Sequence, residues 1–290
     1  MSTARAERVR SGGLVFRDSW PLFVGFAALA IPTVISLADK EWTRDYGGHE
    51  PIVVAVSAWL IWRLWRLVRV GGGPRRWAPA AALLLIGLPT YVFGRAYDFL
   101  TLEAAGLYCV GVALLYASFG FSLVRKLWFP ILFLIFAIPP PHALVDELTA
   151  PLKELVSHLA TSGLSLMGLP VARQGVIIFI AQYELLVEDA CSGMNSLIGL
   201  TALSLLYGYF ARGPSLANSI FMLCLAVPVA VAANVVRVAL LVLITYSFGD
   251  AAAQSFLHFA AGIFLFVAAL TLVFVVDRAA HATLSFARRA

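Results

Sequence analysis

Long apolar runs, separated by short charged segments, constrain this chain more than any other feature of its sequence. Of its 290 residues, 61% are hydrophobic and 13% are charged. Runs of about 18 or more apolar residues cross a bilayer as α-helices, because lipid offers an open backbone no hydrogen-bonding partner. We therefore expect an all-α polytopic membrane protein forming a single membrane domain over residues 1–290. About eight transmembrane helices are predicted, at 21–38, 51–67, 78–94, 100–122, 127–138, 191–210, 216–248 and 256–276.

The segment 142–190 differs in kind from the apolar runs around it. Three prolines at 139–141 end the preceding helix, because proline cannot donate to a helical ladder. Leucines then recur at helical spacing among charged residues, which predicts an extracytoplasmic amphipathic helix lying at the membrane interface. These leucines are Leu144, Leu148, Leu152, Leu155 and Leu159. Two β-prone runs, 176–180 and 183–187, are two residues apart and predict a small β-hairpin.

The positive charges are distributed unevenly, and their distribution predicts the orientation. The 21 Lys and Arg exceed the 16 Asp and Glu. In a membrane protein such an excess marks cytoplasmic loops, so the expected partner is the lipid bilayer and no nucleic acid is expected. With the N-terminus inside, the eight spans place 15 Lys and Arg inside and 5 outside, with Arg237 remaining. Both termini are therefore predicted to be cytoplasmic, and no cleavable signal peptide is expected.

Three residues with reactive or charged side chains fall in the predicted outer parts of apolar runs. Cys191 stands between an acidic pair and a Ser-Gly step, where the run 191–210 begins. Arg237 lies inside the run 216–248, and His258 opens the last run. An arginine at the bilayer centre costs about 2.5–3.5 kcal/mol, so a partner or a wet cavity is expected around it. In the eight-helix topology all three residues converge on the extracytoplasmic face.

These residue types suit acyl transfer by a thiol. A thiol is nucleophilic as the thiolate, and a nearby cation or a helix N-terminus lowers the pKa of a cysteine. His258 can take the thiol proton and return it to the leaving amine. Arg237 can hold the oxyanion of the tetrahedral intermediate. The resulting thioester can pass to water, an amine or a hydroxyl, and the sequence does not distinguish among these acceptors.

Four further polar residues accompany the three and are expected to bind substrate or to support the site. Asp189, Ser192 and Asn195 flank the cysteine. Asn234 precedes Arg237 by three residues, so it shares the same helical face and can orient the guanidinium. Asp189 opposes the cation, because a neighbouring negative charge raises the pKa of a thiol.

The remaining ionisable residues and cysteines offer no competing centre. Cys109 and Cys224 lie within apolar runs and are expected to be packing residues. The histidines show no ligand pairing such as His-x-x-x-His, so metal catalysis is disfavoured, and no cofactor is expected. They are His49, His142, His158, His258 and His281. Glu103, near the start of the run 100–122, faces either the site or the lipid headgroups, and we favour the headgroups.

The motifs resemble those of the exosortase/archaeosortase family of polytopic transpeptidases. The matching stretches are Ala190-Cys191-Ser192-Gly193, Asn234-Val235-Val236-Arg237 and the His258 segment, in the order of the family. The resemblance covers most of the chain from about residue 90 onward. It implies Cys191 as the nucleophile, Arg237 as the transition-state stabiliser and His258 as the acid and base.

The resemblance also implies a substrate class and a location. Family members are expected to recognise a C-terminal sorting signal on exported proteins: a short motif such as Pro-Glu-Pro, a membrane helix and a basic tail. They cleave at the motif and attach the product to a surface acceptor, which is linked to lipid or polysaccharide. The implied location is the inner membrane of exopolysaccharide-producing bacteria, with the site facing the periplasm. Asn195 and Asp189 replace an Arg and a Glu of many members, which indicates a variant subfamily with a different recognition motif.

Two other functions fit the same sequence. A transporter or an exopolysaccharide-export component would use Arg237 on a substrate pathway and would tolerate replacement of Cys191 by Ala or Ser. An intramembrane thiol protease would only hydrolyse its substrate. Its product would end in a free carboxylate, which the product mass distinguishes from a transferred product.

Overall fold

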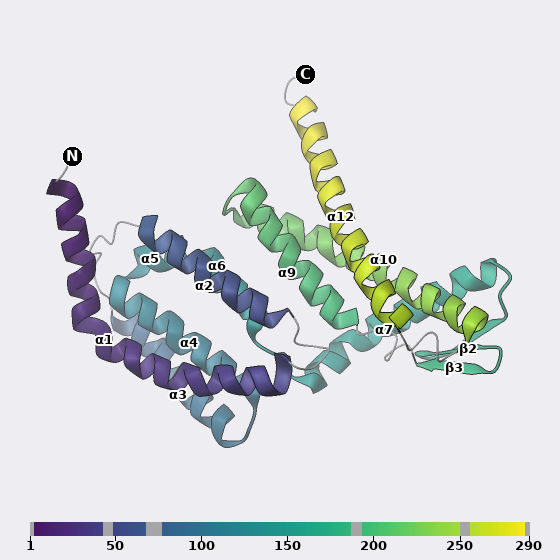
Figure 1. Ribbon diagram of the computed structural model, residues 1–290, viewed down its shortest axis with the longest axis horizontal. Helices are drawn as coiled ribbons and strands as arrows, with labels where there is room; N and C mark the ends of the chain where they lie inside the picture. Colours follow the sequence, from purple (N-terminus) through teal and green to yellow (C-terminus); the bar gives the residue numbers. More distant parts are fainter. Residues whose placement is uncertain (1–2, 43–48, 68–76, 187–192, 250–255, 288–290) are drawn as a thin grey trace. The chain divides into compact units, whose positions relative to one another are not determined.

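The computed structural model describes residues 3–42, 49–67, 77–186, 193–249 and 256–287 (Figure 1). Within these ranges, it does not describe the side chains at 3–19, 66–67, 142–146, 148, 193–196, 256–263 and 281–287. The chain forms two compact units, Met1–Pro141 and His142–Ala290.

Helices joined by short turns make up the described part of the first unit. Its longest helices are apolar, as the sequence predicts, and shorter helical turns connect them. The elements are α1 (Thr3–Leu37), the π-helical turn η1 (Ala38–Trp42), α2 (Glu50–Leu67), α3 (Trp77–Ala96), α4 (Leu100–Phe119), α5 (Phe121–Lys126), α6 (Trp128–Phe133) and the 3-10 turn η2 (Leu134–Ala137).

Helices α3 and α4 form a closely packed hairpin in which glycines bring the two backbones together. A Cβ atom added at Gly94 would lie 2.3 Å from the backbone nitrogen of Glu103. One added at Gly106 would lie 2.4 Å from the backbone nitrogen of Tyr91. Small residues at helix contacts are typical of membrane helices, because tight van der Waals packing replaces the hydrophobic drive that is lost in lipid.

The second unit combines helices with a small sheet. A long helix comes first, three short strands follow, and three further helices complete the unit. The elements are α7 (His142–Leu166), β1 (Val171–Gln174), β2 (Ile177–Ile180), β3 (Tyr183–Leu186), α9 (Gly193–Arg212), α10 (Leu216–Phe248) and α12 (Phe256–Ala287).

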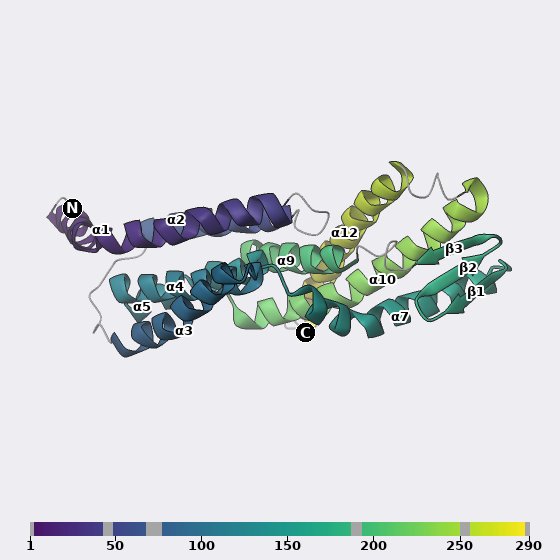
Figure 2. The same cartoon turned by 90° about the horizontal axis from the view of Figure 1, so that it is seen from below.

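The sheet has three antiparallel strands in the order β1-β2-β3, where the sequence predicts a two-stranded hairpin (Figure 2). The predicted hairpin is present as β2 and β3, with Ile180 paired to Tyr183 across a two-residue turn. Ala181 in that turn has a φ of 50°, so a residue other than glycine takes the left-handed conformation there. Val176 was expected in a strand, but it lies in the turn after Gly175, whose φ is 61°. The additional strand β1 lacks a strong β-pattern and forms by pairing with β2.

The core of the second unit lies where α7, β2 and α10 meet. Its fully buried residues are Val156, Ala160, Leu164, Ile178, Ile180, Val238 and Val242. The predicted amphipathic helix is therefore confirmed as α7, but its buried face differs from the expected one. Leu152 packs against this core, whereas Leu155 and Leu159 are 46% and 44% exposed. The helix lies against α10 and the sheet, and its leucine stripe is only partly covered by protein.

Four helices in the described part of the chain are long and apolar enough to cross a membrane. They are Trp20–Trp42, Trp77–Ala96, Leu100–Phe119 and Leu216–Phe248. The predicted span 100–122 ends early, because Gly120 leaves the helix with a φ of 77°. The predicted span 127–138 contains only the short apolar run Trp128–Ala137, about 15 Å long at 1.5 Å per residue, and this is half of a hydrocarbon core. These helices correspond to four of the predicted spans and are candidate spans by their length and composition.

Candidate active site

Helices α9, α10 and α12 pack together in the second unit (Figure 1). Their shared core consists of Leu200, Val229, Ala230, Ala269 and Val273. Helix α10 packs antiparallel to α9. Gly208, late in α9, contacts Met222, early in α10, whereas Leu200, earlier in α9, shares the core with Ala230, later in α10. Helix α12 runs parallel to α9: a Cβ atom at Gly199 would lie 3.8 Å from the ring of Phe266, and the rings of Tyr207 and Phe274 are 4.2 Å apart.

The helix register determines which residues share a level in this bundle. In both contacts between α9 and α12, the α12 residue lies 67 positions later (266 − 199 and 274 − 207). The same offset of 67 positions puts position 260, near the start of α12, at the level of Gly193 at the start of α9. Arg237 lies seven residues after Ala230 on α10, and Gly193 lies seven residues before Leu200 on α9. Arg237 therefore lies at the bundle end where α9 and α12 begin.

Arg237 is buried in an apolar wall beside a small cavity. Arg237 is 8% exposed, and together with Asn234 it lines a cavity of about 20 Å³. The other lining residues are Leu200, Ala230, Ala233, Leu265, Phe266 and Ala269. This volume accommodates about one water molecule. Arg237 follows Leu216 by 21 residues, about 30 Å along a helix, which is the thickness of a hydrocarbon core.

The structure describes the predicted site only in part. Arg237 and Asn234, one helical turn apart on α10, share the cavity wall as expected. The backbones of Asn195 and His258 lie in the first turns of α9 and α12, and their side chains are outside the description. The other three predicted site residues also lie outside the described residues: Cys191, Asp189 and Ser192.

A buried ion pair, which the sequence reasoning missed, lies at the opposite end of the same three helices. The guanidinium of Arg212 donates to the carboxylate of Asp277, and these side chains are 13% and 3% exposed. The Tyr207 hydroxyl donates to the same carboxylate at 3.2 Å, and the Arg212 guanidinium lies 5.0 Å from the ring centre of Phe221. The sequence signal was the acidic residue Asp277 at the end of an apolar run. The pair ties the end of α9 to α12.

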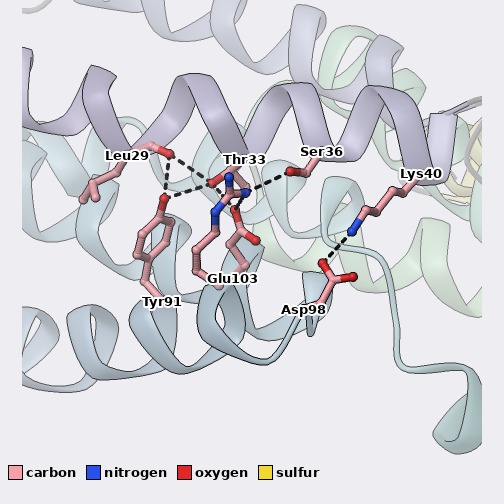
Figure 3. Close-up of polar contacts among 8 residues, drawn as sticks. Leu29, Thr33, Ser36, Lys40, Tyr91, Asp98 and Glu103 are labelled. Carbon is pink, nitrogen blue, oxygen red and sulfur yellow. Dashed lines mark hydrogen bonds and ion pairs between the residues drawn. The ribbon is translucent and has the colours of Figure 1, made fainter.

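Glu103 lies in the interior of the first unit, so the preference for the headgroups is wrong. Its side chain is 2% exposed. The Thr33 hydroxyl of α1 donates to it at 2.7 Å, and Arg95 of α3 donates to it at 3.1 Å (Figure 3). The Tyr91 hydroxyl lies 3.4 Å from Thr33 and donates to the backbone carbonyl of Leu29. Glu103 thus joins three helices through a polar network.

The two cysteines outside the motif differ in their surroundings. A Cβ atom at Gly87 would lie 2.9 Å from the Cβ atom of Cys109, which is half-buried between α3 and α4 as expected of a packing residue. Cys224 is exposed on α10, so the prediction that it packs within the protein is wrong.

Comparison with known proteins identifies a family to which the chain is similar. A family model described as "Transmembrane exosortase" matches residues 42–275. The match covers most of both compact units, and it includes the positions 191, 237 and 258. No curated protein and no solved structure matches the chain.

Proposed function

The chain belongs to the transmembrane exosortase family, and on this premise we propose that it is a cysteine transpeptidase embedded in the membrane. Its substrates are exported proteins with a C-terminal sorting signal. It cleaves the signal through a thioester on Cys191 and transfers the protein to a surface acceptor linked to lipid or polysaccharide. His258 is the acid and base, and Arg237 stabilises the transition state.

The position of Arg237 carries this proposal. A guanidinium in an apolar wall, beside a cavity that holds about one water molecule, is a strong electrostatic stabiliser because little solvent screens it. The helix register supports the assignment of the other two residues. Cys191 lies two residues before Gly193 in the sequence, and His258 lies two residues before position 260. Gly193 on α9 and position 260 on α12 are the described positions that share a level, and this supports the pairing of the cysteine with the histidine.

The reaction has two balanced steps. In the first, His258 takes the proton of the Cys191 thiol, and the sulfur attacks the carbonyl carbon of the scissile peptide bond. The C–N bond then breaks, and His258 returns the proton to the leaving amine. In the second, an acceptor hydroxyl or amine gives its proton to His258 and attacks the thioester. The C–S bond breaks, and the thiolate recovers the proton. Arg237 binds the oxyanion in both steps.

The apolar helices and the charge distribution support a membrane location with cytoplasmic termini, and the family implies the bacterial inner membrane. Both termini lie in the cytoplasm of a bacterial cell, and the chain crosses the inner membrane several times. Cys191, Arg237 and His258 then face the periplasm, where exported substrates arrive. Asp189, Ser192, Asn195 and Asn234 support the site or contact the substrate.

A transporter or an exopolysaccharide-export component is the second candidate function. The buried arginine beside a cavity is the observation that favours it, because intramembrane charges also mark substrate pathways. This function needs no nucleophile, so Cys191→Ala would retain it.

Substrate processing in cells tests the proposal. A protein carrying a C-terminal sorting signal from the same genome is co-expressed with the wild-type chain or with Cys191→Ala, Arg237→Ala or His258→Ala. Val236→Ala, at a 47% exposed neighbour of Arg237, is the matched control. We expect processing to be lost in the three site variants at normal expression and kept in the control.

The terminal mass of the processed protein completes this experiment. A mass that includes an acceptor group identifies transfer, whereas a free carboxylate identifies hydrolysis alone. Normal processing by Cys191→Ala would remove the thioester mechanism and favour the transporter.

A further inference from the structure

The strand β3 forms an edge of the sheet. The strand order is β1-β2-β3, so β2 is the partner of β3 among the strands that the structure describes. The strand comprises only Tyr183–Leu186, directly before the segment that contains Cys191. An edge strand presents backbone N–H and C=O groups to which another extended chain can pair.

The hairpin register identifies the backbone groups that point away from β2. Ile180 and Tyr183 are register partners that flank the two-residue turn. The residues that flank such a turn form a hydrogen-bonded pair, and hydrogen-bonded pairs alternate with non-hydrogen-bonded pairs along an antiparallel ladder. Leu185 therefore bonds to β2, whereas Glu184 and Leu186 direct their N–H and C=O groups outward. Two residues of β3 thus offer four backbone groups at the free edge.

The side chains of β3 hold this edge in place. Tyr183 and Leu185 pack against the core formed by α7, β2 and α10, and the Tyr183 hydroxyl lies near Gly249 at the end of α10. Glu184, on the other face, is exposed. The strand is therefore anchored on one face, and β2 is the described strand to which it pairs.

From these observations we propose that the free edge of β3 binds the substrate segment beside the scissile bond as an added strand. Cys191 follows Leu186 by five residues, at most about 18 Å of extended chain, so a segment paired with β3 lies within reach of the nucleophile. Backbone pairing supplies binding for any extended sequence, and side-chain pockets add specificity. This inference rests on the proposed function, since it names where that function binds its peptide.

Proline substitutions test the outward N–H groups. Glu184→Pro and Leu186→Pro each remove one outward N–H and leave the bonds to β2 in place. We expect each to reduce processing about tenfold, the effect of losing one backbone hydrogen bond to a substrate. Arg173→Pro on β1 places the same ring on the opposite edge of the sheet and should retain processing within about twofold. Glu184→Ala and Leu186→Ala keep the N–H groups and should therefore lose less processing than the matching proline variants.

Disulfide cross-linking gives a readout that does not depend on cleavage. Leu186→Cys is introduced into a chain in which Cys109, Cys191 and Cys224 are Ala, and single cysteines are scanned through the substrate around its cleavage site. Strand pairing predicts cross-links at alternate substrate positions, because side chains alternate across a strand. Cross-links without this two-residue period, or none at all, would overturn the edge-strand proposal.

The two experiments separate this inference from the proposed function. Alternating cross-links with no processing by the wild-type chain would retain the binding edge and reject the transpeptidase. Processing that survives both proline variants would reject the edge and retain the transpeptidase. A disulfide-linked dimer of the Leu186→Cys chain in preference to substrate cross-links would show that the edge pairs with a second copy, and it would overturn the proposal.

Discussion

At the residue scale, the burial of single ionisable groups determines how strongly they interact with neighbouring charges. Arg237 is 8% exposed in an apolar wall, so little solvent screens its positive charge. In the proposed mechanism this charge stabilises the oxyanion. Asn234 shares the cavity wall and can fix the orientation of the guanidinium. Geometry as well as charge should therefore matter at this position.

Arg237→Lys tests this requirement. Lysine keeps the positive charge but lacks the planar fork of arginine, so the aligned hydrogen bonds to an oxyanion are lost. We expect processing to fall by about 10²-fold or more, the effect of losing one oxyanion donor. Processing rates of purified enzyme in detergent, compared with Val236→Ala, measure the difference. Full activity of the lysine variant would limit the role of Arg237 to its charge.

Glu50 is a second buried charge, and it makes stability depend on pH. The residue is 3% exposed at the start of α2, before the apolar run of that helix, and burial raises its pKa to about 7 from 4.5. The Trp42 indole donates to it at 3.1 Å and opposes this rise. The folded chain thus holds a proton that the unfolded chain has released, so stability falls as pH rises from about 4.5 through 7.

Glu50→Gln should remove this pH dependence. Glutamine keeps the shape and carries no charge, so we expect the variant to be more stable than the wild type by about 1–3 kcal/mol at pH 8 and equally stable at pH 4. Thermal unfolding in detergent across this pH range measures it. Glu154→Gln, at a side chain 65% exposed, is the control and should leave the profile unchanged.

At the element scale, the helix contacts depend on glycine at some positions and on charge at others. The hairpin of α3 and α4 requires backbones in contact, whereas α9 and α12 are joined at one end by the ion pair of Arg212 and Asp277. Both contacts determine helix register.

Gly94→Ala should destabilise the first unit. The added methyl group would lie 2.3 Å and 2.8 Å from backbone atoms of Glu103. These atoms are backbone, so the clash can be relieved only if α3 and α4 move apart. We expect a loss of about 1–3 kcal/mol, measured as a lower unfolding temperature in detergent. Gly25→Ala, where nothing lies within 4 Å of the new atom, should be neutral or slightly stabilising.

Asp277→Asn should destabilise the bundle by about 3–5 kcal/mol, because it leaves the Arg212 charge buried without its carboxylate. The double variant Arg212→Met with Asp277→Leu should recover most of this loss, since it removes both charges. Unfolding temperatures of the three proteins measure the effect. Arg278→Gln changes an exposed neighbouring charge and should have no effect. A stable Asp277→Asn protein would show that the ion pair contributes little.

At the scale of the whole molecule, the membrane sets the orientation of the chain. The proposed topology places the sheet outside and the turn before α6 inside. Gln182, in the turn between β2 and β3, and Lys126, at the end of α5, are both exposed. Both positions are accessible, and the proposed topology puts them on opposite sides of the membrane.

Cysteine labelling at these two positions tests the topology. In a chain whose three native cysteines are replaced by alanine, Gln182→Cys should react with a membrane-impermeant maleimide added to spheroplasts. Lys126→Cys should react only after lysis, because the bilayer excludes the reagent. The reverse pattern would invert the topology and place the site on the cytoplasmic side.

The sequence by itself determined the helical membrane character, the helix α10 to its exact bounds and the family to which the chain belongs. These features depend on local composition: an apolar run must satisfy its own backbone in lipid, whatever its neighbours are. The amphipathic helix and the β2–β3 hairpin follow from local periodicity in the same way.

The tertiary structure alone decided which faces meet. It placed Glu103 inside a network with Thr33 and Arg95, joined Arg212 to Asp277, and added β1 to the hairpin. It also set the register that puts Arg237 at the bundle end where α9 and α12 begin. These outcomes depend on packing between residues distant in the sequence, and each partner gains its burial and its hydrogen bonds only when the other is already in place.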